Sequence, residues 1–229
     1  MNLLNNQKSI GAITVLSGIL GLACLIATLV AVNFNNDALS DPVLILSTAG
    51  VNINAARWSM IFDMFGYYLL LLPVIYLLHN WLRVRTAWSN LVTFSALAYV
   101  LIGSIGASIL AVVWPNIIDA YQQAPAAEQL VLKANFSLIN DVVYNGMWNL
   151  LEMAFAATWW ISTGYLLKEN KFKFLGWLTI ITGISCLGDA VAGIFQIDIL
   201  HEISLNIYLI LAIVWAIVVG IFLVRIKLS

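Results

Sequence analysis

The feature that most constrains this chain is a series of long apolar runs that charged residues rarely interrupt. Residues 10–32 carry no charge and are long enough to cross the roughly 30 Å hydrocarbon core of a bilayer as a helix. A signal peptide has an apolar core of only about 7–15 residues, so this run predicts a retained membrane helix. Of the 229 residues, 62% are hydrophobic and 9% are charged, whereas soluble domains are roughly 25% charged. The sequence therefore predicts a polytopic membrane protein.

Six membrane helices are predicted, and they form a single all-α domain over residues 1–229. Lipid offers no water to satisfy backbone groups, so a spanning segment must be helical. Pro125 suits the first turn of a helix, and the fourth helix is expected to begin there, outside the membrane. The predicted helices are residues 10–32, 58–78, 89–114, 125–167, 175–195 and 207–224.

Basic residues are divided unequally between the two sides of this arrangement. The side that carries both termini has most of them: Lys8, Arg83, Arg85, Lys168, Lys171, Lys173, Arg225 and Lys227. The other side has only Arg57 and Lys133 and is acidic. Cytoplasmic loops carry an excess of Lys and Arg, so both termini are predicted to be cytoplasmic.

A weak internal repeat relates the second and third helices to the fourth and fifth. At a shift of about 89 positions Asp63-Met64 falls on Glu152-Met153, and Tyr76-Leu77-Leu78 falls on Tyr165-Leu166-Leu167. The two pairs are predicted to be parallel copies of one hairpin, although coincidence in apolar sequence remains an alternative. Repeats in transporters often frame a central site.

Three carboxylates lie inside predicted membrane helices, namely Asp63, Glu152 and Asp189. Counted from the cytoplasmic ends of their helices at about 1.5 Å per residue, all three lie ~21–22 Å up. Three helices that place acids at one depth predict a shared pocket that opens outward. Buried carboxylates are costly in hydrocarbon and usually mark function. Such a pocket suits proton exchange, a cationic ligand or a divalent metal.

Further candidate residues surround these acids. On an α-helix Asp141, Asn145, Trp148, Asn149 and Glu152 share one face, which predicts a polar stripe that runs into the fourth helix. Beside Asp63, the proposed site takes in Arg57 as a counter-ion and Tyr67 as part of an aromatic wall. Each has a structural alternative: the acids and Tyr67 as helix-packing residues, and Arg57 as an interfacial anchor beside Trp58.

Most familiar chemistries find no support in the sequence. The two cysteines, Cys24 and Cys186, fall in separate apolar runs and are typical of packing residues. A basic patch for nucleic acid and the usual nucleotide, hydrolase and zinc-protease motifs are absent from the sequence. His201 lies on a predicted outer loop. Together with Asp63, Glu152 and Asp189 it would form a hypothetical metal site.

The whole chain resembles a bacterial family of six-helix integral membrane proteins of unknown function. The resemblance rests on Arg57-Trp58 with Asp63 and Pro73, on Trp148-Asn149 with Trp159-Trp160, and on Leu175-Gly176-Trp177. It implies a six-helix architecture and a bacterial cytoplasmic membrane. It implies no activity and no catalytic residue.

Three functions are compatible with these patterns. The first is binding or transport of a small cationic or amphipathic ligand in an outward-facing acidic pocket, with proton coupling. The second is a metal-dependent enzyme that acts on membrane lipid. The third is an accessory subunit, in which the acids join helices and the long fourth helix docks a partner. The sequence leaves the cofactor, the ligand and the oligomeric state open.

Overall fold

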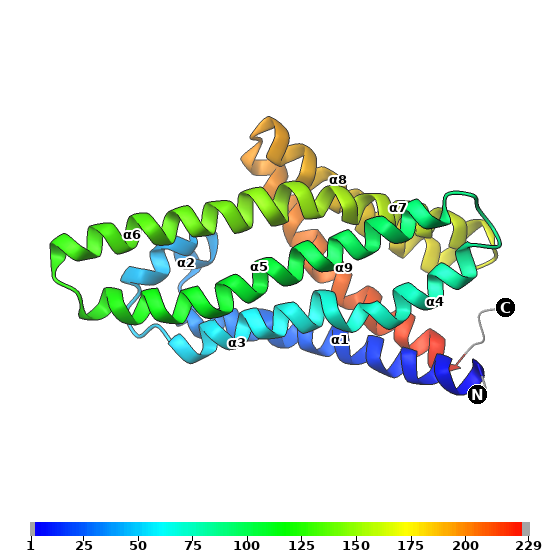
Figure 1. Cartoon of the computed structure of the whole chain (residues 1–229), viewed down its shortest axis with the longest axis horizontal. Helices are drawn as coiled ribbons and strands as arrows, with labels where there is room; N and C mark the ends of the chain where they lie inside the picture. Colours follow the sequence, from blue (N-terminus) through cyan, green and yellow to red (C-terminus); the bar gives the residue numbers. More distant parts are fainter. Residues whose placement is uncertain (1–2, 226–229) are drawn as a thin grey trace.

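The computed structural model describes residues 3–225, which are almost entirely helical (Figure 1). Within this described part no β-strand occurs. Four long helices of this part are uninterrupted by irregular turns: α1 (Leu3–Ala31), α5 (Ser89–Gln123), α8 (Lys173–Phe195) and α9 (Asp198–Arg225). The all-α prediction is confirmed.

Two other long rods are composite. In the first, α3 (Ile53–Asp63) continues through the π-helical segment η2 (Met64–Tyr68) and the 3₁₀ segment η3 (Leu69–Leu71) into α4 (Leu72–Leu82). Pro73 explains part of this irregularity, because it cannot donate a backbone hydrogen bond one turn back. In the second, α6 (Ala126–Asn140) continues through the π-helical segment η4 (Asp141–Glu152) into α7 (Met153–Glu169).

The third long helix is longer than predicted. The sequence predicted that it ends at residue 114 and is followed by a loop, but α5 (Ser89–Gln123) runs straight through Pro115. A proline inside a helix costs roughly 3 kcal/mol. Burial of one large apolar side chain contributes about 1.5–3 kcal/mol, and both Trp114 and Ile118 are buried in one cluster with Phe136 of α6. Packing between α5 and α6 thus offsets the cost, and these helices form a hairpin that extends past the other helices (Figure 1).

The last helix also differs from its prediction. It was expected at residues 207–224, with an acidic loop before it, but α9 begins at Asp198. His201 and Glu202 therefore lie on the first turns of a helix and not in a loop. The connection from α8 is short because Gln196 adopts a left-handed conformation with φ 55° and ends that helix.

Two short segments, α2 (Asn36–Ser40) and η1 (Pro42–Ser47), join α1 to α3. Ile45 and Leu46 of η1 are buried in a cluster that includes side chains of α5 and η4. The apolar patch of this connection therefore caps one end of the bundle.

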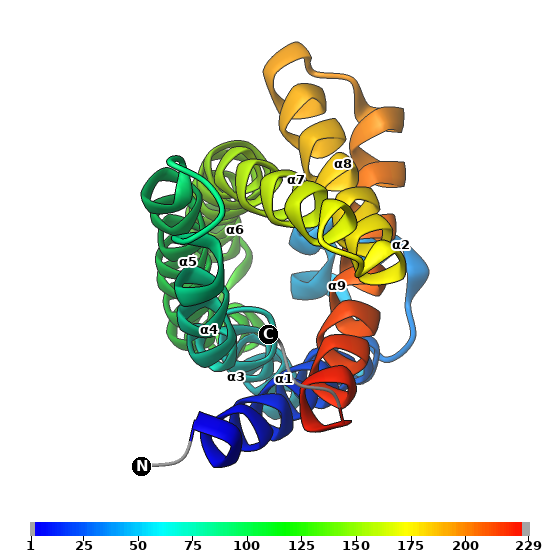
Figure 2. The same ribbon diagram turned by 90° about the vertical axis from the view of Figure 1, so that its right-hand side faces the viewer.

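The long helices form a ring in chain order when viewed along the bundle (Figure 2). α1 packs on α3, α3 on α5, α5 on η4 and α7, α7 on α8, and α8 on α9, which returns to α1. Two glycines allow the ring to close: a Cβ added at Gly11 would lie 2.6 Å from the Gly220 carbonyl oxygen. Buried aromatic and polar side chains fill the interior of the ring.

Several helices have the length and composition of membrane spans. Within the described residues five meet both criteria: Gln7–Ala31, Ile53–Leu82, Ser89–Gln123, Lys173–Phe195 and Asp198–Arg225. The rod of α6, η4 and α7 is not among them. The structure thus has the character of a membrane protein, whereas the sixth span remains a prediction.

Candidate functional site

The candidate site consists of three buried carboxylates on three different rods. Asp63 is the last residue of α3, Glu152 is the last residue of η4, and Asp189 lies on α8. Glu152 and Asp189 are 0% exposed and Asp63 is 8% exposed. The Tyr68 hydroxyl from η2, which directly follows Asp63, donates to Glu152, and α8 with Asp189 packs on η4. The fold therefore brings together three residues that lie far apart along the chain.

Each of these carboxylates has one oxygen that is left unsatisfied. Asp63 Oδ2, Glu152 Oε1 and Asp189 Oδ2 are buried and have no hydrogen-bond partner among the described residues. A buried acceptor without a partner costs about 1–3 kcal/mol, and more if it is charged. Native proteins satisfy most such groups. Each of these oxygens can accept one more hydrogen bond or contact a cation.

Tyrosines pack around Glu152. The Tyr68 hydroxyl donates to Glu152 Oε2 at 3.2 Å. The Tyr99 hydroxyl donates to the Tyr67 backbone oxygen at 2.7 Å and lies 2.9 Å from the Tyr208 hydroxyl. A hydroxyl has a single proton, so Tyr208 is the donor in that second bond. Tyr68 thus contacts the central acid directly, and its ring packs on that of Tyr99, with centroids 5.3 Å apart.

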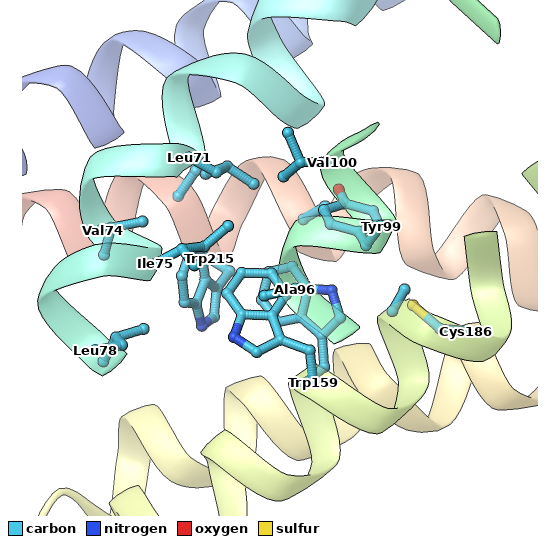
Figure 3. Close-up of a cluster of buried hydrophobic side chains, with 14 of the residues drawn as sticks. Leu71, Val74, Ile75, Leu78, Ala96, Tyr99, Val100, Trp159, Cys186 and Trp215 are labelled. Carbon is cyan, nitrogen blue, oxygen red and sulfur yellow. The ribbon is translucent and has the colours of Figure 1, made fainter. Parts of the chain in front are cut away.

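Tryptophans continue this aromatic interior. The Tyr99 ring stacks on Trp159 with centroids 5.8 Å apart, and the Trp160 and Trp215 rings meet edge to face at 4.5 Å. Figure 3 shows Tyr99, Trp159 and Trp215 meeting from three different helices. Trp215 Nε1 donates to Thr179 Oγ1 at 2.8 Å, which satisfies its polar atom. These rings extend the aromatic interior from Tyr99 to Trp215.

The third acid is paired. Asp189 Oδ1 lies 2.5 Å from His201 Nδ1, and the His201 side chain is 34% exposed. His201 therefore links the exterior to a carboxylate that is completely buried. Its position on α9 creates this contact, because the first turns of α9 pack beside the last turns of α8.

The other predicted residues divide into buried and exposed groups. Trp148 and Asn149 are buried near Glu152 on the same helix, and Trp148 Nε1 donates to the Gly103 backbone oxygen at 3.3 Å. Tyr67 is buried and its hydroxyl donates to the Leu209 backbone oxygen at 3.1 Å. Arg57 is exposed, beside exposed Trp58. That position is typical of an interfacial anchor, and no described contact joins Arg57 to Asp63.

Asn145 is placed differently from its prediction. It is exposed and donates to Asp141 Oδ1 at 3.1 Å, apart from the buried acid. The predicted stripe assumed an α-helix, but η4 is π-helical over its whole length. A π-helix has i→i+5 hydrogen bonds and more residues per turn than an α-helix, so a stripe laid out for an α-helix spreads around it. Asp141 and Asn145 are exposed, whereas Trp148, Asn149 and Glu152 are buried.

The hypothetical metal set does not form. Within the part of the chain that the structure describes, no group of three or more His, Cys, Asp or Glu side chains is arranged to hold a metal ion. This includes the set of Asp63, Glu152, Asp189 and His201. Cys24 and Cys186 are buried free thiols on α1 and α8.

One cavity in the described part of the chain has no acid in its lining. It is small and apolar, and its lining residues are Val74, Leu78, Leu167, Leu175, Trp215, Val219, Phe222 and Leu223. None of the three carboxylates lines this cavity. The outward-facing pocket therefore remains a prediction.

Sequence reasoning missed Tyr68, Tyr99 and Tyr208. A usable signal was present: a tyrosine in the middle of an apolar run carries a hydroxyl that needs a partner when it is buried. All three lie in such runs. No protein-family model, curated protein or solved structure matches this chain. The resemblance to a six-helix family stays a prediction.

Proposed function

We propose that this chain is a membrane transport protein that binds a small cationic or amphipathic ligand at Asp63, Glu152 and Asp189 and exchanges protons there. The observation that carries the proposal is the set of three buried carboxylates, each with one unsatisfied oxygen. A cation supplies the charge that such a group lacks.

The chemistry of the surrounding residues suits such a ligand. The Tyr68 hydroxyl donates a hydrogen bond to Glu152. The Tyr68 ring packs on Tyr99, and the Tyr99 ring stacks on Trp159. Aromatic faces attract organic cations, and this attraction is strongest where water is excluded. In the absence of a cation, protons can neutralise the same carboxylates. Binding of one then displaces the other, which is the basis of proton-coupled exchange.

Irregular backbone beside the acids supports movement at the site. Asp63 immediately precedes η2, and Glu152 ends η4. π-Helical turns occur frequently at functional sites and permit local bending. We propose that the two composite rods bend at these segments to admit the ligand from the outer side.

The proposed topology has six spans with both termini in the cytoplasm of a bacterium, and the chain sits in its cytoplasmic membrane. The start of α1, the end of α9 and the α4–α5 and α7–α8 connections lie at one end of the bundle (Figure 1). These connections carry Arg83, Arg85 and Lys171. This distribution supports the positive-inside assignment. The parallel repeat is supported by the composite character of the two rods that it relates.

A set of isosteric substitutions tests the proposal. Asp63→Asn, Glu152→Gln and Asp189→Asn each remove a charge with little change in shape, and each is expected to weaken ligand binding at least about tenfold. The measurement is equilibrium binding of tetraphenylphosphonium and of a panel of small amines to the purified protein. Asp141→Asn is the matched control, since Asp141 is an exposed acid near Glu152 in the chain. Unchanged binding of every probe in all three variants contradicts the proposal.

The accessory-subunit function has one supporting observation. Exposed apolar side chains lie along the α6 half of the projecting hairpin, at Leu130, Val131 and Leu138. A stable partner that copurifies with the native chain and is lost from a Leu130→Glu variant would favour it. The metal-dependent enzyme has weaker support, since its four side chains form no metal-binding group.

A further inference from the structure

The turn between α7 and α8 carries a cluster of cationic side chains at the end of the bundle opposite the projecting hairpin (Figure 1). A surface hollow there is lined by Lys168, Glu169, Lys173 and Trp177. Lys171 occupies the tip of the turn, is exposed, and has a left-handed backbone with φ 75°. Three lysines against one glutamate make this turn positively charged.

Lys168 is held in position by aromatic rings. Its Nζ lies 4.7 Å from the Trp177 ring centroid and 5.6 Å from that of Tyr165. Each ring face attracts the ammonium group, because the face carries negative charge density. The ammonium group still has donors that can reach an anion.

Close backbone contact makes this part of the hairpin rigid. A Cβ added at Gly176 would lie 2.7 Å from Lys168 Cα, and one added at Gly164 would lie 2.8 Å from the Gly176 carbonyl oxygen. Both glycines thus let α7 and α8 pack backbone against backbone. A second hairpin supports the turn, because Arg85 Nε donates to Asn170 Oδ1 at 3.4 Å. The cations are therefore presented by a preorganised surface, which lowers the cost of binding.

Exposed aromatic residues locate the hollow at the level of lipid headgroups. Trp177, Phe174 and Tyr165 are 52%, 70% and 54% exposed and flank the lysines. Exposed aromatic rings next to basic residues are typical of the membrane–water interface. A free phosphate would use only the lysines, whereas a phospholipid would contact the lysines with its headgroup and the rings with its glycerol and upper acyl chains.

We infer that the hollow formed by Lys168, Lys173 and Trp177 binds the phosphate headgroup of an anionic phospholipid. Basic pockets between membrane helices bind anionic lipid headgroups, and each Lys near an anionic surface adds to the attraction. No carboxylate of the described residues forms an ion pair with Lys168 or Lys173. The hollow is separate from the three buried acids, so the inference does not depend on the proposed function.

The test is native mass spectrometry of the full chain from nanodiscs of phosphatidylcholine that contain a small fraction of phosphatidylglycerol. The wild type is expected to retain phosphatidylglycerol preferentially, and Lys168→Ala/Lys173→Ala is expected to weaken this retention about tenfold or more. Lys8→Ala/Lys133→Ala removes the same charge elsewhere and should retain the lipid as the wild type does. Trp177→Leu keeps apolar bulk but removes the ring under Lys168, and it should cause a smaller loss.

Three outcomes would overturn the inference. The first is equal retention of phosphatidylglycerol by the wild type and the Lys168→Ala/Lys173→Ala variant. The second is equal retention of phosphatidylcholine and phosphatidylglycerol by the wild type. The third is displacement of the lipid by an equal concentration of inorganic phosphate, which would identify a free-phosphate site. If the double alanine variant does not fold, the single charge reversal Lys173→Glu at the exposed start of α8 serves the same comparison.

Discussion

Glu152 presents the sharpest energetic problem at the scale of single residues. Its side chain is completely buried, and the Tyr68 hydroxyl is its one described hydrogen-bond donor. One neutral hydrogen bond contributes only about 0.5–1.5 kcal/mol, whereas a buried charge costs several kcal/mol. The residue is therefore stable in the bundle only with a proton or a cation. That requirement underlies the proposed exchange of the two.

The Asp189–His201 pair leads to a prediction about protonation. The chain has two histidines, so His79→Gln leaves His201 as the only imidazole that NMR detects. In that background Asp189→Asn is expected to change the titration midpoint of His201 more than Asp198→Asn does. The reason is that Asp189 contacts the ring at 2.5 Å, whereas Asp198 acts on it only through its charge. Equal changes in the two variants would mean that the pair is not formed.

Glycines set how closely the helices approach at the scale of elements. A Cβ at Gly103 of α5 would collide with the Tyr68 ring, and one at Gly106 would collide with the Trp148 indole. Both aromatic residues flank the acid site. The absence of a side chain at two positions of α5 thus decides where the site residues of η2 and η4 can lie.

This contact predicts opposite behaviour for two Gly→Ala substitutions. Gly103→Ala is expected to destabilise the protein by about 1–3 kcal/mol through overpacking, and to displace Tyr68 from Glu152. Gly146→Ala lies in η4 with no atom within 4 Å of the added Cβ, so it should be neutral or stabilising by up to about 1 kcal/mol. Thermal unfolding in detergent measures both. A similar loss of stability in the two variants would refute the close approach at Gly103.

The path of the fourth rod can be tested at the scale of the whole molecule. In a background of Cys24→Ala and Cys186→Ala, single cysteines are introduced as Lys133→Cys on α6 and Lys171→Cys after α7. With six spans, a membrane-impermeant maleimide should label Lys133→Cys in intact cells and Lys171→Cys only after permeabilisation. Both native cysteines are buried and small, so their removal is expected to be tolerated. Labelling of both positions from the same side would exclude the sixth span.

Much of the architecture could be predicted without the structure. The apolar runs predicted helices at the right places, because the length of a spanning helix depends on the thickness of hydrocarbon and not on its neighbours. The errors lay at helix ends, at Pro115 and before residue 207. There, burial of Ile118 and contact between His201 and Asp189 extend the helices, and such contacts are not visible in local sequence.

The apolar runs of the sequence were enough to predict long helices that contain three acids. The contacts of those acids became known from the packing of the helices. Tyr68 reaches Glu152 across 84 positions of the chain, and Asp189 pairs with His201 through helix packing. The tertiary structure also decided that Asn145 faces away, since η4 is π-helical. Hydropathy and helix length depend on residues that are neighbours in the chain, whereas side-chain partners depend on how separate helices pack.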